Sequence, residues 1–349
     1  MLRRLLGGPS RQPAYQVKIS LPKREFPFAR TASFDSLAPV IRLHLSLLLV
    51  TASLVFSSCG TKPLPSDEVR RPEVFTPPVV DPAPAEPATS YNRLSSPTRA
   101  VPRPPVGPPA VAAQRVIVLD ALTGRPLYTK NADQRCAVAS TQKLLTALTV
   151  MKSGSVSDPV TITSSDTRVE PSKLYLKPGE TYTRRDLLKA LIVKSGNDVA
   201  KALARDVGGS EASFMSMMNA HGRSIGMTNS NFVNPHGLTE PGQYSTARDI
   251  GLCALVAYRQ PLLRSYMATT SYTFRRPSGA TKPLKNTNRL LRNETWVTGM
   301  KTGTTNLSGR CLVSAGQHNG AHVIVVVLKS TSSSVWNDSE KLLNWALQR

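Results

Sequence analysis

The chain has 349 residues, of which 40% are hydrophobic, and 44 Lys and Arg against 22 Asp and Glu give a formal net charge of +22. This length allows one to three domains with a core of ordinary size. The charge suits a polyanionic neighbour, but the sequence has no zinc-ligand cluster, helix-turn-helix signature or basic run with interleaved aromatics. We therefore expect no nucleic-acid binding.

The first 59 residues have the pattern of an export leader. Residues 1–42 are basic, and residues 43–60 contain no Asp, Glu, Lys or Arg. A basic flank, an apolar run and small residues at its end are typical of a secretory signal. The run ends at Phe56-Ser57-Ser58-Cys59, which is similar to a bacterial lipobox with Phe in place of the usual Leu. We expect a lipid on Cys59 to tether the mature protein to a membrane. The alternative is an uncleaved signal anchor, although this run makes a marginal membrane span.

A proline-rich segment follows the leader. Fourteen of the 28 prolines lie between positions 61 and 113. This composition predicts a tether over residues 60–113 that is disordered or partly polyproline II. Such a segment would reach roughly 40 Å as a coil and up to about 160 Å when extended. A featureless spacer is equally compatible with the pattern.

Residues 114–349, which carry +15 of the net charge, are expected to form the folded domain. Runs of β-branched and apolar residues predict strands at 115–120, 126–128, 160–162, 173–176, 311–315 and 323–328. Asp120 to Gly124 supplies a turn after the first strand, and Asn319-Gly320 is a strong hairpin signal between the last two. Strands at both ends with helices between them predict an α+β fold, in which helices flank an antiparallel sheet and a helical lobe is inserted.

Helical periodicity fills the middle of this domain. The first helix begins near Ser140, and its apolar stripe is Leu144, Leu145, Leu148 and Met151. Further helices are expected after Thr183, from Asp198 to Gly208-Gly209, after Ser210, from Ser245 to Tyr258, and around 336–345. Thr183 and Asp198 are expected N-caps, and Ser245 with Asp249 resembles a capping box.

Ser140 and Lys143 lie one helical turn apart on the same face of the first helix. A hydroxyl is a poor nucleophile until a base takes its proton, and a lysine can act as that base only when it is neutral. A helix N-terminus disfavours a nearby ammonium and presents backbone N–H groups to an oxyanion. Alone, however, the spacing fits an N-cap serine and a solvated lysine better than a catalytic pair.

Two later motifs change that interpretation. Ser195-Gly196-Asn197 lies between two helical segments, and Lys301-Thr302-Gly303 enters the β-rich end. Ser-x-x-Lys, Ser-x-Asn and Lys-Thr-Gly in this order form the signature of penicillin-binding proteins and serine β-lactamases. From about Gln114 onward the chain resembles the low-molecular-mass penicillin-binding proteins, the D-alanyl-D-alanine carboxypeptidases. Secondary similarities lie at 234–238, 244–249 and 309–312.

The resemblance implies a catalytic role for three side chains. Ser140 would be the acyl-ester nucleophile, and Lys143 would accept its proton. Ser195 would lie beside Lys143 and relay a proton to the leaving amine, since a hydroxyl both donates and accepts. The backbone N–H groups of Ser140 and Thr304 would form the oxyanion hole.

Four further residues would bind substrate. Asn197 would offer its amide to the substrate backbone. Lys301, on an edge strand, would pair with a terminal carboxylate and also lower the pKa of Lys143. Thr302 would hydrogen-bond that carboxylate, and Gly303 would let the substrate approach the strand because it lacks a Cβ atom.

Other candidates are weaker. Arg248 could add charge near the carboxylate or be solvated on a helix, and His236 is expected to structure a loop. The five histidines and the cysteines lack metal-ligand spacing, so we expect no metal and no cofactor. Cys253 and Cys311 lie in apolar runs and are expected to be buried thiols, and with Cys136 they leave an odd number for pairing.

The sequence therefore predicts an exported, penicillin-sensitive serine D-Ala-D-Ala carboxypeptidase of the cell envelope or periplasm, acting on peptidoglycan stem peptides with β-lactams as inhibitors. A D,D-endopeptidase that cuts cross-links would use the same residues. A β-lactamase is disfavoured because the second motif is Ser-Gly-Asn and not Ser-Asp-Asn. A non-catalytic wall-binding protein is disfavoured because it would not need all the motif residues.

Overall fold

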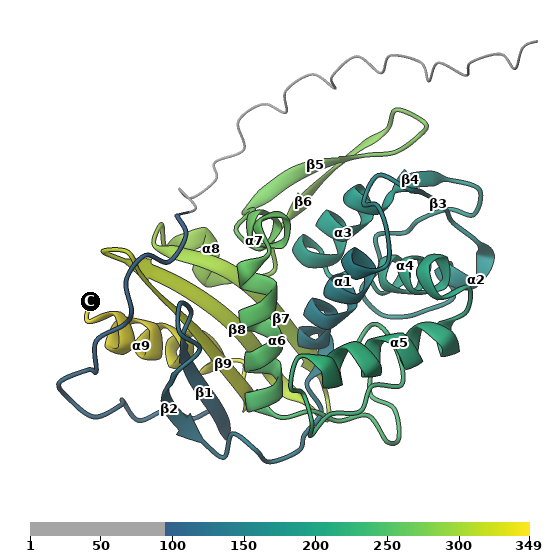
Figure 1. The fold of residues 1–349 in the computed structure, drawn as a ribbon. Coiled ribbons are helices and arrows are strands. Elements are labelled where there is room, and N and C mark those ends of the chain that lie inside the picture. The colour runs from purple at the N-terminus through teal and green to yellow at the C-terminus, as the bar shows by residue number, and fades with distance from the viewer. Residues whose placement is uncertain (1–94) are drawn as a thin grey trace, which may run out of the picture. The chain divides into compact units, whose positions relative to one another are not determined.

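The computed structural model describes residues 95–349, so the leader (1–59), Cys59 and most of the expected tether lie outside the described residues. Strands from both ends of the described region form one five-stranded antiparallel sheet in the order β2-β1-β9-β8-β7 (Figure 1). The strands are β1 (Arg115–Asp120), β2 (Pro126–Lys130), β7 (Val297–Thr305), β8 (Gly309–His318) and β9 (Ala321–Ser330). The predicted α+β class, with helices inserted between the sheet's strands, is confirmed.

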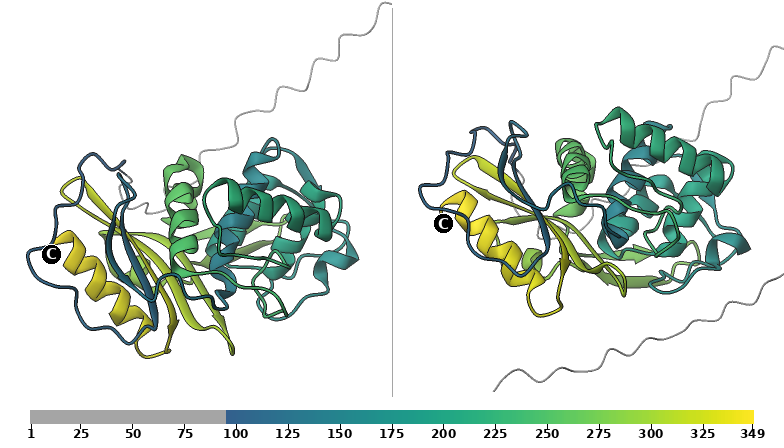
Figure 2. Two further views of the ribbon diagram at one scale, coloured as in Figure 1. Left: turned by 60° about the horizontal axis from the view of Figure 1, so that its bottom comes forward. Right: turned by 90° about the horizontal axis from the view of Figure 1, so that it is seen from below.

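Helices cover both faces of this sheet. Helix α6 (Ala247–Arg259) packs on one face and α9 (Val335–Leu347) on the other (Figure 2). Side chains alternate accordingly along β1, where Ile117 belongs to the core beneath α6 and Val118 to the core beneath α9. Residues 323–328 of β9 are all buried, because a strand covered on both faces has no solvent side.

The helices between β2 and α6 form the predicted lobe. Its elements are η1 (Ala139–Gln142), α1 (Lys143–Lys152), α2 (Ser164–Thr167), α3 (Arg184–Val193), α4 (Asn197–Gly208) and α5 (Glu211–Ser224), with a small sheet of β3 (Pro159–Thr161) and β4 (Thr181–Thr183). Thr183 caps α3 in a capping box with Asp186, as predicted. Within the described part of the chain, no helix is long and apolar enough to cross a membrane.

Two predictions around Asp198 were wrong. The N-cap of α4 is Gly196, and residues 173–176 do not form a strand. Both differences have one cause, because the buried Asp198 carboxylate accepts hydrogen bonds from the backbone N–H groups of Leu174, Tyr175 and Leu176 at 2.8–3.2 Å. The carboxylate thus takes the donors that a neighbouring strand would have needed.

The segment before β7 also differs from prediction. The N-cap of α6 is Thr246, not Ser245, and Thr246 accepts from the Asp249 N–H. Four elements that we did not predict follow: α7 (Pro261–Met267), β5 (Ser271–Arg275), β6 (Thr281–Lys285) and α8 (Arg289–Asn293). Strands β5 and β6 form a separate hairpin that extends above α3 (Figure 1).

Residues 95–113, here called the N-terminal strap, were expected to belong to the tether but pack on the folded domain. The strap's Val101 N–H donates to the buried Asp120 carboxylate at 2.9 Å, and its Ala113 N–H donates to the Asp338 carboxylate at 2.9 Å. Buried carboxylates with backbone donors fix a segment that has few apolar residues of its own. The folded domain therefore begins before residue 114.

Candidate active site

The predicted nucleophile lies in a tight backbone turn. Ser140 is half-buried in η1, directly before α1, and the preceding Ala139 has a left-handed φ of 50°. Two glycines pack against this turn. A Cβ atom on Gly237 would lie 2.2 Å from the Ala139 carbonyl oxygen, and one on Gly303 would lie 2.9 Å from the Ser140 nitrogen. A glycine at position 303 is therefore needed for a second reason besides the predicted approach of substrate. Without a Cβ atom, β7 can lie against the backbone of Ser140.

Lys143 is fully buried and touches the nucleophile. Its Nζ lies 2.8 Å from Ser140 Oγ, 2.7 Å from Asn197 Oδ1 and 2.6 Å from the carbonyl oxygen of His236. A neutral amine has two hydrogens and one lone pair. It can donate to Asn197 and His236 and still accept from the Ser140 hydroxyl. The three contacts thus suit a neutral Lys143 acting as a base toward Ser140.

The electrostatics favour that neutral form. Burial holds the pKa of Lys143 well below its ordinary value, and the nearby Lys301 lowers the pKa further, while Asp198 opposes the shift. Lys301 is itself 1% exposed, and burial lowers its pKa to about 7. A low-dielectric site disfavours the charged form of each amine, and two adjacent cations disfavour each other.

Ser195 contacts Lys301 directly. Lys301 Nζ donates to Ser195 Oγ at 2.8 Å and to the Thr302 carbonyl oxygen at 3.0 Å. Ser195 was expected beside Lys143, but the residue of its loop that reaches Lys143 is Asn197. The structure therefore places two serine–lysine pairs next to one another, linked by the loop from Ser195 to Asn197.

The remaining predicted binding residues lie on β7. This strand is at the edge of the sheet, as predicted for Lys301, and it packs against η1. The Thr302 hydroxyl lies 2.6 Å from that of Thr287, and Thr304 is exposed. An edge strand beside the nucleophile leaves backbone groups that an extended peptide can pair with.

The secondary candidates have structural explanations. The backbone of His236 contacts Lys143, and burial lowers the pKa of its ring to about 3, so the ring is neutral. Arg248 makes two hydrogen bonds to Asp133 at 2.6 and 2.9 Å, which favours the surface interpretation. Cys253 and Cys311 are buried free thiols as predicted, and Cys136 is buried too. Across residues 95–349, no group of three or more His, Cys, Asp or Glu side chains is placed to hold a metal ion.

Sequence reasoning missed the segment that supports the Ser195 loop. The Asn197 side-chain amide donates to the Pro171 carbonyl, and the Ser172 hydroxyl donates to the Ser195 carbonyl at 3.3 Å. Among the described non-glycine residues with positive φ, four belong to the site or to this support: Ala139, Ser172, Tyr175 and Ser195. Backbone strain of this kind concentrates at functional sites. The one signal in the sequence was Asp198, directly after the Ser195–Asn197 motif.

The family described as D-alanyl-D-alanine carboxypeptidase, peptidase S11, matches residues 103–332 of the chain. The chain belongs to this family. It is 32% identical over 243 residues to the D-alanyl-D-alanine carboxypeptidase DacF of Bacillus subtilis, covering 68% of the chain, and 34% identical over 257 residues to the D-alanyl-D-alanine endopeptidase of Pseudomonas aeruginosa, covering 70%. The chain spans 62% of the length of DacF and 82% of that of the endopeptidase.

Solved members of the D-alanyl-D-alanine carboxypeptidase fold match the structure as well. The Streptomyces K15 DD-transpeptidase superimposes with a TM-score of 0.66 at 32% identity. The match covers 70% of this chain and 100% of that enzyme. The shared fold therefore extends over the full length of that enzyme's chain.

Proposed function

We propose that this protein is a serine-type D-alanyl-D-alanine carboxypeptidase that trims peptidoglycan stem peptides through an acyl-enzyme on Ser140. The observation that carries the proposal is the 2.8 Å contact between Ser140 Oγ and a completely buried Lys143 amine whose pKa is depressed. A surface lysine would stay charged and could not take a proton. Membership of the family and the names of its relatives support the same activity.

Acylation follows from the two serine–lysine pairs. The Ser140 oxygen attacks the carbonyl of the penultimate D-alanine while Lys143 takes the hydroxyl proton, and the backbone N–H groups of Ser140 and Thr304 stabilise the oxyanion. The amide bond then breaks. Ser195, which lies 2.8 Å from the Lys301 amine, passes a proton to the leaving nitrogen of the terminal D-alanine, and the proton that Lys143 took from Ser140 replaces the one that this pair gives up. Water then hydrolyses the ester and frees Ser140.

Substrate binding uses β7 and the Ser195 loop. Lys301 and Thr302 would bind the terminal carboxylate, and an arriving carboxylate favours the protonated form of Lys301. The Asn197 amide would bind the peptide backbone through its second N–H, since its oxygen contacts Lys143 and its first N–H donates to Pro171. A pocket of about 610 Å³ is lined by His236 and by charged residues such as Arg168. It offers room for the rest of the stem peptide.

The test uses labelled penicillin, which resembles the substrate and acylates the same nucleophile. Mass spectrometry of the digested protein should find the label on Ser140, and Ser140→Ala should carry none. Ser153→Ala is the matched control, because Ser153 lies at the other end of α1 and its hydroxyl donates to the Thr149 carbonyl oxygen. Label on another residue, or rapid hydrolysis of the drug, would contradict the proposal.

A D,D-endopeptidase is the second candidate, because the Pseudomonas relative that bears this name matches over more of its own length than DacF does. Cleavage of a cross-linked muropeptide dimer in preference to a pentapeptide would favour it. A β-lactamase is disfavoured by the place of its deacylating motif in the fold. The sequence contains Glu340-x-x-Leu343-Asn344, resembling the deacylating motif, but these residues lie within α9, which packs on β8 and β9 on the sheet face opposite α6.

We also propose that the protein works in the cell envelope, exported by the leader and held by a lipid on Cys59 or by a signal anchor. The pattern of residues 1–59 supports this location, and so do the relatives, which are named for cleaving D-alanyl-D-alanine peptides. The tether that remains before the strap, residues 60–94, would let the domain reach its substrate. Mass spectrometry of membrane fractions should find diacylglycerol on Cys59, and a Cys59→Ser variant that still carried the lipid would contradict the assignment.

A further inference from the structure

Tyr175 is an exposed aromatic residue held in an unusual conformation. Its side chain is 63% exposed, and its backbone has a left-handed φ of 63°. This conformation is unfavourable for a residue that carries a Cβ atom. Neither the proposed mechanism nor the packing of the core uses the ring. Strain that the fold maintains around an exposed ring points to a use for the ring.

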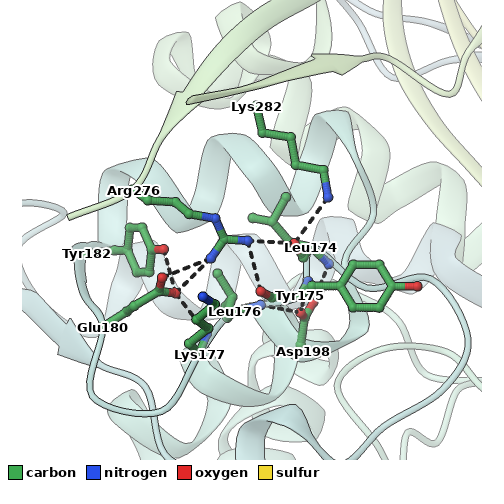
Figure 3. Close-up of polar contacts among 9 residues, drawn as sticks. All are labelled: Leu174, Tyr175, Leu176, Lys177, Glu180, Tyr182, Asp198, Arg276 and Lys282. Atoms are coloured by element: carbon green, nitrogen blue, oxygen red, sulfur yellow. Dashed lines mark hydrogen bonds and ion pairs between the residues drawn. The ribbon is translucent and has the colours of Figure 1, made fainter. Parts of the chain in front are cut away.

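Two charged side chains hold the backbone of Tyr175 from opposite sides. Its N–H donates to Asp198 at 2.8 Å, and its carbonyl accepts from Arg276 at 2.9 Å. Arg276, which follows β5, is fixed in turn by Glu180 at 2.9 and 3.0 Å. Figure 3 shows this cluster, in which the Tyr175 ring points away from Arg276 and Glu180. These bonds fix the backbone that carries the ring, so less backbone entropy is lost when a ligand binds there.

The ring lies beside the active site. Pro171, four residues earlier, contacts Asn197 through its carbonyl, and Asn197 contacts Lys143. Four residues span at most about 14 Å. The ring also has basic neighbours, because the ammonium of Lys282, on β6, lies over it at 5.2 Å from the ring centroid and the ammonium of Lys173 lies at 5.9 Å. The segment from Pro171 to Tyr175 therefore joins the aromatic ring to Asn197, which contacts Lys143 in the candidate active site.

We propose that Tyr175 and Lys282 form a saccharide subsite that binds a sugar ring of the glycan strand carrying the stem peptide. The inference rests on the proposed function and names the form of its substrate. Sugar rings have apolar C–H faces that stack on aromatic rings, and tyrosine combines such a face with a polar tip. The Lys282 ammonium donates one hydrogen bond to the Leu174 carbonyl oxygen at 3.4 Å and has two further N–H donors for hydroxyl and acetamido oxygens. A stem of five residues spans up to about 18 Å when extended, so the sugar to which it is attached lies well away from the carbonyl that Ser140 attacks.

The test compares kcat/KM on a disaccharide-linked pentapeptide and on the free pentapeptide. Tyr175→Gly removes the ring, and glycine adopts a positive φ without strain, so the melting temperature should stay the same or rise. We expect a selective loss of about fivefold to tenfold on the disaccharide-linked substrate, expressed in KM, and less than about twofold on the free peptide. Tyr175→Trp should keep the preference, and Lys282→Gln should lose part of it.

A control and a second readout complete the design. Leu307, 56% exposed in the turn after β7, is the matched residue, and Leu307→Gly should leave the substrate preference unchanged. Equal losses on both substrates, or no loss with Tyr175→Gly, would overturn the subsite. Calorimetric binding of the disaccharide-pentapeptide to Ser140→Ala, with and without Tyr175→Gly, measures the subsite without catalysis. If the proposed activity failed, penicillin would not label Ser140 in the unaltered chain, whereas failure of the subsite alone would leave that labelling intact.

Discussion

Charged side chains are buried in two regions of this domain, with opposite consequences. Beneath the N-terminal strap, Asp120 and Asp338 each accept three hydrogen bonds from fixed donors, mostly backbone N–H groups. In the active site, Lys143 and Lys301 face oxygen acceptors and one another. The carboxylates join segments of the fold, while the amines are held where charge is disfavoured.

The comparison shows what separates a structural buried charge from a chemically active one. A carboxylate surrounded by N–H donors has its lone pairs satisfied and has no reason to react. A lysine surrounded by neutral oxygens, with a second lysine nearby, is pushed toward the free amine, which is a base. Changes in the amine region should therefore alter chemistry, and changes in the carboxylate region should alter stability.

The largest effect is expected at Lys143. Lys143→Met keeps the volume but removes the base, so the rate of acylation by penicillin should fall by about 10³-fold. Stopped-flow or quench measurements of the acylation rate test this. Lys189→Met is the matched control, since Lys189 is also buried in the lobe, over the Tyr272 ring at 4.6 Å, and should change the rate less than about threefold. Equal losses in both variants would remove the special role of Lys143.

A smaller effect is expected at Gly303. The Cβ atom of Gly303→Ala would press on the Ser140 backbone, and a displaced nucleophile should lower the acylation rate by about 10²-fold. Gly316→Ala on β8 is equally crowded, with its Cβ atom 3.0 Å from the Trp296 ring. Both variants should lose about 1–3 kcal/mol of unfolding free energy. Only Gly303→Ala should lose acylation in the folded protein, and similar rates in both would contradict this account.

Lys301→Gln should shift the pH dependence of the acylation rate. Lys301 lowers the pKa of Lys143, so its removal should raise that pKa. Since only the neutral amine accepts a proton, the rate should then begin to fall at a higher pH as the solution is acidified. Loss of the carboxylate contact should also raise KM by about tenfold. A pH–rate profile with the same acidic limb in both proteins would show that the two lysines do not interact.

The smallest effect on chemistry is expected beneath the strap. Asp338→Asn replaces an acceptor of three hydrogen bonds by a group with one acceptor oxygen, and should lower the unfolding free energy by about 2 kcal/mol. The acylation rate should change less than about twofold. Asp133→Asn is the control, because the exposed pair with Arg248 should contribute less than about 1 kcal/mol. Urea denaturation of the three proteins separates these outcomes.

The sequence predicted the parts of the structure that depend on local spacing. Ser140 and Lys143 meet because they are one turn apart, and Asn319-Gly320 forms the predicted hairpin with φ values of 46° and 75°. The contact between Ser195 and Lys301 joins residues 106 positions apart. Only the resemblance to a family predicted that these two residues share one site. The partner predicted for Ser195 was Lys143, whereas the structure has Lys301.

Long-range polar contacts explain what was missed. The Leu174–Leu176 segment has the composition of a strand, but the Asp198 carboxylate binds its backbone N–H groups. No pattern within the segment itself predicts that contact. The strap looks like a disordered tether because it is rich in proline, yet Asp120 and Asp338 hold it. The β5–β6 hairpin was missed because charged residues and Pro283 interrupt the alternation on which strand prediction depends.

The most direct test is an NMR titration of the Lys143 side chain, followed through its ¹³Cε signal and assigned with Lys143→Met. The account predicts a transition well below the ordinary lysine value of about 10.4, so that the amine is neutral at the pH where the protein reacts with penicillin. A transition at or above the ordinary value would show a permanently charged lysine. Lys143 could not then serve as the base for Ser140.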